Sequence, residues 1–243
     1  MAKIPTDPKE TYPEIIEDYK ALFGEDLISI ILYGSATGKD YRPGKSDINF
    51  MIVLTEEGIG QLEKAFKTIE KWRKRRVATP LFLTKFYIET STDVFPIEYF
   101  NFKENHVLVY GEDILNDLSF NAEFIRLQCE REIKGKLLLL REAYLDSAGK
   151  GKALKEIIGQ SIGAFTAIFK ALLFLKGEKA PAEVREIIRL TCQSFDLDSG
   201  LFEKLLDIKQ EKVKPGDEDM RKIYEDYLRE VRKLSKLVDA IGG

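Results

Sequence analysis

A polar loop between two apolar runs carries the residue types of a phosphate and metal site. It lies in ILYGSATGKDYRPGKSDINFMIVL, residues 31–54, with Gly34 and Ser35 at its start and Asp47 and Asn49 at its end. Residues two apart in a strand project to the same face, so Asp47 and Asn49 are expected to lie together. Magnesium prefers hard oxygen ligands and shares its shell with phosphates. A turn with Gly34 and Ser35 can bring backbone N–H groups and a hydroxyl against a phosphate.

The same residue types also occur in ordinary connections between strands. Glycine, serine, aspartate and asparagine all favour turns, so either end of the loop alone is a weak signal. The joint spacing of the two ends, with an apolar strand on each side, is what favours a binding site.

The first half of the chain mixes helices and strands around this loop. Asp7, Glu10 and Pro8 are typical of a helix start, and Gly24 can end that helix. A second helix is predicted over 58–77, with Leu62, Phe66 and Ile69 facing inward. Short apolar runs predict the strands, at residues 27–33, 47–54, 81–86, 94–100 and 107–110.

The second half is helical throughout. Apolar residues recur at helical spacing in five segments separated by glycine and proline, at residues 121–146, 151–176, 181–194, 199–211 and 217–240. We therefore predict an α/β (α+β) domain with a mixed sheet over residues 1–118, followed by an all-α helical bundle over 119–243.

Composition indicates a globular, cytoplasmic protein. The net charge of −3 argues against general nucleic-acid binding. The apolar helix at 151–176 is nearly long enough to span a bilayer, but the near-central Lys170 favours a buried bundle helix and no membrane. We read no signal peptide in the first residues. Cys129 and Cys192 have no metal-binding spacing and are expected to be reduced and buried.

The loop resembles the signature of the DNA polymerase β-type nucleotidyltransferase superfamily. Gly34-Ser35, eleven further residues and Asp47-Ile48-Asn49 before an apolar strand look like its Gly-Ser and Asp-x-Asp motifs. The similarity is closest to the minimal and aminoglycoside-modifying enzymes, several of which carry a C-terminal helical bundle. The resemblance implies Mg²⁺ (or Mn²⁺), a nucleoside triphosphate, and transfer of its nucleoside monophosphate to a hydroxyl of a small molecule or protein.

The resemblance also assigns roles to individual residues. It implies nucleotide binding by Gly34, Ser35 and Ser46. It implies metal binding and catalysis by Asp47, Asn49 and Glu98. Glu98 lies in the apolar run 94–100 and is the preferred third acid of the motif, with Asp93 as the alternative.

Asn49 departs from the family pattern, which has a second acid at this position. An amide oxygen can bind a hard cation but brings no charge. Unit charges about 4 Å apart interact by roughly 4 kcal/mol at an effective dielectric of 20, so this loss weakens a metal site. Two readings stay open, a transferase with an altered metal site and a catalytically silent descendant that binds nucleotide or a protein partner.

Two further features bear on partners. The basic run at residues 71–76 could bind an anion, but cations at a helix C-terminus also complement the helix dipole, and we do not expect nucleic acid. The helical half could shape the substrate cleft or form a homodimer.

Overall fold

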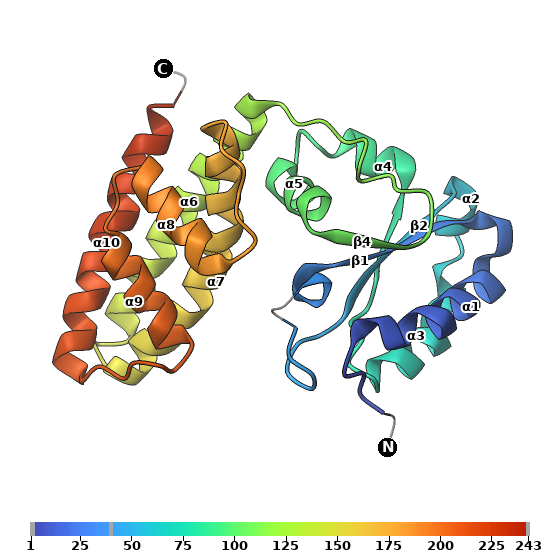
Figure 1. Ribbon diagram of the computed structural model, residues 1–243, viewed down its shortest axis with the longest axis horizontal. Coiled ribbons are helices and arrows are strands. Elements are labelled where there is room, and N and C mark those ends of the chain that lie inside the picture. The colour runs from blue at the N-terminus through green and yellow to red at the C-terminus, as the bar shows by residue number, and fades with distance from the viewer. Residues whose placement is uncertain (1–2, 39–40, 242–243) are drawn as a thin grey trace. The chain divides into compact units, whose positions relative to one another are not determined.

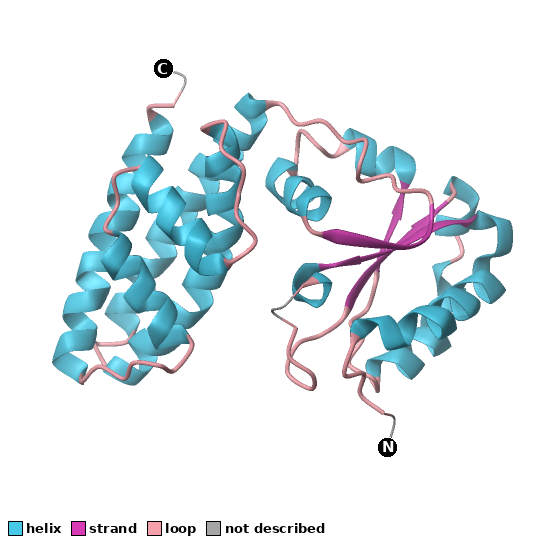
Figure 2. Cartoon of the chain, viewed as in Figure 1, coloured by secondary structure: helices cyan, strands magenta, loops and turns pink. Residues whose placement is uncertain are grey.

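The computed structural model describes residues 3–38 and 41–241, which form two compact units. The N-terminal unit comprises Met1–Val94 and Tyr99–Ser119, and the helical unit comprises Phe95–Glu98 and Phe120–Gly243. The predicted fold class is confirmed, because a mixed sheet with helices is followed by helices alone (Figure 2). The structure groups residues 95–98 with the helical unit, whereas the sequence placed them in the first domain.

A four-stranded mixed sheet forms the centre of the N-terminal unit. Its strands are β1 (Leu27–Tyr33), β2 (Asn49–Leu54), β3 (Leu81–Thr84) and β4 (His106–Gly111), in the order β3-β2-β1-β4. β1 is antiparallel to β2 and β4, whereas β2 and β3 are parallel. The connection between β1 and β2 contains the polar loop, so pairing of these two central strands brings the ends of the loop together.

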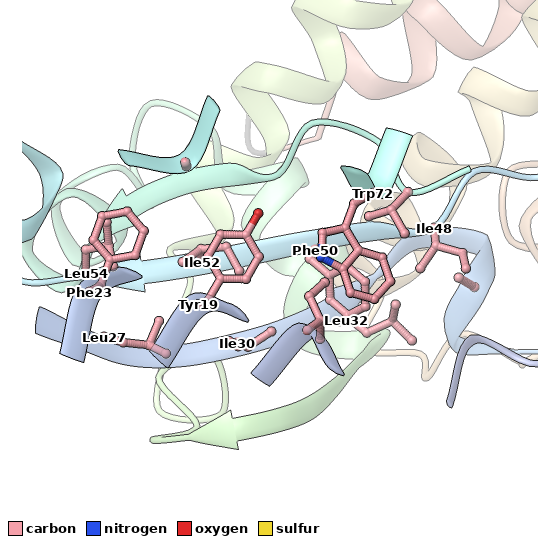
Figure 3. Close-up of a cluster of buried hydrophobic side chains, with 14 residues drawn as sticks. Tyr19, Phe23, Leu27, Ile30, Leu32, Ile48, Phe50, Ile52, Leu54 and Trp72 are labelled. Atoms are coloured by element: carbon pink, nitrogen blue, oxygen red, sulfur yellow. The ribbon is translucent and has the colours of Figure 1, made fainter. Parts of the chain in front are cut away.

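The main apolar core of this unit lies on one face of the sheet (Figure 3). α1 (Tyr12–Phe23) follows the predicted capping box of Asp7 and Glu10 and ends before Gly24. Its Tyr19 and Phe23 pack with Trp72 from α3 (Phe66–Arg73) over alternate residues of β1 and β2. The unit also contains several short helices, η1 (Pro8–Thr11), η2 (Gly24–Asp26), η3 (Gly34–Thr37), α2 (Glu56–Ile59), η4 (Leu62–Ala65) and α4 (Lys85–Thr90).

Two predicted elements are wrong. The run 94–100 is not a strand, because α5 (Pro96–Glu104) begins there. Proline suits the first turn of a helix, and the backbone N–H of Ile97 donates to the Gln128 side chain at 2.7 Å. The run 81–86 is a strand only to Thr84, whose side chain caps α4.

The predicted helix over 58–77 is divided among α2, η4 and α3, and this shifts the buried face. Leu62 and Phe66, predicted to face inward, are 37% and 65% exposed. Ala65 and Trp72 are buried instead, and Ile69 is partly buried against the same core.

Replacing Trp72 with alanine is expected to lower the free energy of unfolding by about 3–5 kcal/mol, because the side chain is 1% exposed and leaves a large cavity. Its Nε1 also donates to Asp18 at 2.8 Å. The matched control, Phe66→Ala, should change stability by less than about 0.5 kcal/mol. Trp72 is the only tryptophan in the chain, so denaturation is followed by circular dichroism. Equal losses in both variants would contradict the assigned core.

The helical unit contains five long helices, close to the predicted segments. They are α6 (Ala122–Asp146), α7 (Gly151–Leu175), α8 (Val184–Ser194), α9 (Ser199–Lys209) and α10 (Asp217–Asp239) (Figure 1). α7 contacts each of the other four, and Phe165 and Phe169 on it pack against Phe202 of α9 and Tyr227 of α10. Aromatic side chains from three helices therefore meet in this core.

α7 alone, among the helices of the described chain, is long and apolar enough to cross a membrane. Its contacts with four neighbouring helices and its ten buried residues agree with the prediction of a bundle helix.

Cys129 and Cys192 are free and buried, and burial raises the pKa of each thiol to about 12. Both thiols therefore stay protonated and unreactive at neutral pH.

Candidate functional site

The Gly-Ser turn follows β1 directly. Gly34 has a left-handed backbone (φ +78°), which glycine adopts without strain, and it starts η3. The Thr37 hydroxyl donates to the Gly34 carbonyl at 2.8 Å and closes the turn. Gly34 and Ser35 are both exposed. The turn thus presents backbone and a hydroxyl to solvent at the end of a buried strand.

The motif residues at β2 alternate between the two faces, as the sequence predicts. Ile48 and Phe50 are fully buried in the core cluster (Figure 3). The Asp47 side chain is 58% exposed, and Asn49 is partly buried on the opposite face from the cluster.

Strand pairing places Asn49 against the turn. Asn49 is paired with Tyr33, the residue before Gly34. A Cβ atom at Gly34 would lie 3.2 Å from Asn49 Nδ2. The absence of a side chain at Gly34 therefore leaves room for the amide of Asn49, and the two ends of the polar loop meet.

Asp47 lies beside a guanidinium group. Arg76 Nε is 3.6 Å from Asp47 Oδ1, and both side chains are partly exposed. Arg76 Nη2 donates to the carbonyls of Gly44 and Lys45 at 3.0 Å each. Sequence reasoning treated Arg76 only as part of a basic run. Its position depends on a left-handed backbone and on contacts about thirty residues away, for which the sequence gives no signal.

Ser46 has a structural contact in the loop. Its hydroxyl accepts from the backbone N–H of Arg42 at 3.1 Å, and its own N–H donates to the Arg42 carbonyl at 2.8 Å. These bonds form the turn that leads into Asp47. Nucleotide binding by Ser46 stays a prediction.

The neighbouring strand brings no acid to the face of Asn49. Met51 and Val53 share that face, and they pair in parallel with Leu81 and Leu83 of β3. Within the described residues, no group of three histidines, cysteines or acids is arranged to hold a metal ion. β3 therefore adds no acid beside Asp47 and Asn49.

Glu98 lies on helix α5. Its role as third acid was predicted on the assumption that residues 94–100 form a strand, and that assumption is wrong. Glu98 is exposed in α5, and its carboxylate accepts from Gln128 Nε2 at 2.7 Å within the helical unit. Asp93, the alternative, is exposed in the turn after α4. The choice of a third acid stays a prediction for both residues.

An aromatic contact borders the motif. Tyr33, the partner of Asn49, meets the Phe102 ring edge-on with centroids 4.8 Å apart. Burial raises the pKa of the Tyr33 hydroxyl above its usual value, so the ring is neutral at physiological pH. The ring therefore adds packing, not charge, next to the turn.

Much of the basic run at 71–76 is engaged in ion pairs. Lys71 pairs with Glu14 and Asp18, and Arg75 pairs with Glu14 while lying over the Trp72 ring at 4.6 Å. These contacts leave less free positive charge for a polyanion.

Comparisons with known proteins give a structural match only. No model of a known protein family matches the sequence, and there is no significant match among curated proteins. The chain is similar in structure to spectinomycin adenyltransferase AAD(9) from Enterococcus faecialis, solved with ATP and spectinomycin. The TM-score is 0.52 at 12% identity, over 92% of this chain and 99% of that one. The chain therefore has a nucleotidyltransferase-like fold.

Proposed function

We propose that this protein transfers a nucleoside monophosphate from a nucleoside triphosphate to a hydroxyl group of a small molecule. The observation that carries the proposal is the contact between the two ends of the polar loop, where Asn49 lies against the Gly34 turn and the exposed Asp47 stands two residues before it. The similarity to an enzyme solved with ATP and spectinomycin supports this class of reaction and a small-molecule acceptor. A protein acceptor is the alternative.

The donor set fits one magnesium ion that arrives with the triphosphate. A carboxylate oxygen of Asp47 and the amide oxygen of Asn49 would hold it, with phosphates and water completing the shell, which is the usual arrangement for Mg²⁺. The set does not fit two resident ions, because β3 contributes leucines on this face. When bound, the ion would neutralise charge that develops on the phosphates.

The residues of the chain would hold and orient the triphosphate. The exposed Gly34-Ser35 turn allows a phosphate to approach the backbone closely. The acceptor hydroxyl attacks the α-phosphorus, a new oxygen–phosphorus bond forms, and the bond to the β-phosphate oxygen breaks as pyrophosphate leaves. The hydroxyl proton passes to a base, and Glu98 remains the predicted candidate for that role.

Two measurements on the full chain test the proposal. Isothermal titration with ATP, GTP, CTP and UTP, with and without Mg²⁺, should show saturable binding of at least one triphosphate. Incubation with an α-³²P-labelled triphosphate and spectinomycin or other aminocyclitol and aminoglycoside acceptors should yield a labelled product. Absence of binding for all four triphosphates would refute the proposal.

The second candidate function is nucleotide binding without transfer. It is favoured by Asn49, which adds no charge, and by Arg76, whose guanidinium lies 3.6 Å from the Asp47 carboxylate. Binding of a triphosphate with no labelled product for any acceptor, protein extracts included, would favour it.

Replacing Asn49 with aspartate distinguishes the two candidates. The new carboxylate would double the charge offered to a cation, so we expect the Mg²⁺ concentration at half-maximal transfer to fall by about 10- to 100-fold. The matched control, Asn116→Asp, adds the same charge at an exposed position outside the polar loop and should have no effect. Transfer by Asn49→Asp but not by the natural chain would identify a silent descendant. No change in Mg²⁺ dependence would mean that Asn49 does not face the ion.

A further inference from the structure

Arg76 has an unusual backbone for its residue type. Its φ is +65°, a left-handed conformation that costs free energy for any residue except glycine. Its carbonyl accepts from the N–H of Ile48 at 2.9 Å, and Ala78 donates back to the Ile48 carbonyl at 2.9 Å. These bonds fix Arg76 next to the motif strand. A strained residue held in this way is a reason to look for a role of its side chain.

The side chain is held by the loop just before Asp47 and lies beside Asp47 itself. Nη2 donates to the carbonyls of Gly44 and Lys45, before Asp47 in the loop, and Nε approaches Asp47 itself at 3.6 Å. The Arg76 side chain is 41% exposed although its Nε atom is buried, so a ligand at the motif can reach the exposed part of the group. Guanidinium groups bind phosphate oxygens through paired hydrogen bonds and remain charged at all physiological pH values.

The charge at this motif therefore differs from that of a site with three carboxylates, which is the pattern of the family that the loop resembles. One acid, Asp47, is balanced by one guanidinium, Asn49 is neutral, and β3 presents Leu81 and Leu83. A cluster of acids repels a triphosphate until cations neutralise it. The pair of Asp47 and Arg76 has no net charge and does not repel a triphosphate in this way.

We propose that Arg76 neutralises Asp47 while no divalent cation is bound, so that the site binds a nucleoside triphosphate without metal. Magnesium is then required for transfer and not for binding. This inference rests on the proposed function, because it concerns the same triphosphate site.

The test compares ATP affinity in EDTA and in excess Mg²⁺, with inorganic tripolyphosphate as a probe that has no base. The Kd of the natural chain is expected to differ by less than about 10-fold between the two conditions. Arg76→Gly removes the guanidinium and relieves the left-handed strain, so the fold is kept, as a thermal melt can verify. This variant should lose at least 10-fold in affinity in EDTA and clearly less in Mg²⁺.

Two further variants sharpen the comparison. The Arg73 side chain belongs to the same basic run and contacts the Thr79 hydroxyl at 3.4 Å. Arg73→Ala should therefore leave the affinity for ATP unchanged both in EDTA and in Mg²⁺. Asp47→Ala should tighten binding in EDTA by several-fold, because it removes a negative charge and frees Arg76.

Each outcome decides the inference. Binding by the natural chain in Mg²⁺ but not in EDTA would overturn it while leaving the proposed function intact. Equal losses for Arg76→Gly in both conditions would also overturn it, because Arg76 would then only support the loop. Absence of binding in both conditions would overturn the proposed function and the inference together.

Discussion

Replacing Asp47 with asparagine is expected to lower the rate of nucleotidyl transfer by about 100- to 1,000-fold. Asp47 is the one carboxylate of the motif, and Asn49 brings no charge with which to compensate. An interaction of roughly 4 kcal/mol between unit charges about 4 Å apart corresponds to about a thousandfold in an equilibrium constant, and solvent reduces that value. Asparagine keeps the shape of the side chain, so the loop should fold normally. The rate is measured with an α-labelled triphosphate at saturating Mg²⁺.

The controls for this result are the two candidates for the third acid. Asp93→Asn and Glu98→Gln are the same type of change in the predicted alternatives. If one of them matches the loss seen for Asp47→Asn, that residue is the third acid. If neither does, neither of these residues is the third acid. Full transfer by Asp47→Asn would mean that the metal site lies elsewhere.

The alternation of buried and exposed side chains at β2 and the helices of the second half were predictable because both depend on local spacing. Alternation along β2 follows from the two-residue period of a strand, and it places Ile48 and Phe50 in the core as expected. The five long helices follow from a 3.6-residue period interrupted by glycine and proline.

The segment around Glu98 shows where local patterns fail. Its run of apolar residues is as compatible with a strand as with a buried helix, and its length cannot decide between them. The deciding contact is the bond from the Ile97 N–H to Gln128, a residue of α6 some thirty positions later. The exposure of Phe66 has a similar cause, because division of one predicted helix into three shifts the helical phase.

The sequence alone could not distinguish Arg76 from the other cations of the basic run at residues 71–76. A left-handed arginine has no sequence signature, and its partners in the loop become close only after β2 joins the sheet. The guanidinium that lies beside Asp47 is therefore identified only in the fold.

Replacing Gly34 with alanine is expected to weaken triphosphate binding by at least about 10-fold and to lower the free energy of unfolding by about 1–2 kcal/mol. The loss of stability follows from the left-handed backbone, which disfavours any side chain. The loss of binding has a separate cause. The added methyl group would lie 3.2 Å from Asn49 Nδ2, which must move, and it would occupy the exposed surface of the turn that a phosphate approaches.

A second glycine separates these two effects. Gly177, after α7, has a similar φ of +71°, and a Cβ atom there would meet no atom within 4 Å. Gly177→Ala should therefore show a comparable loss of stability in urea denaturation with unchanged affinity for ATP in isothermal titration. If the two variants lost stability and neither lost affinity, the turn at Gly34 would serve the fold alone, and the phosphates would have to be bound by other residues.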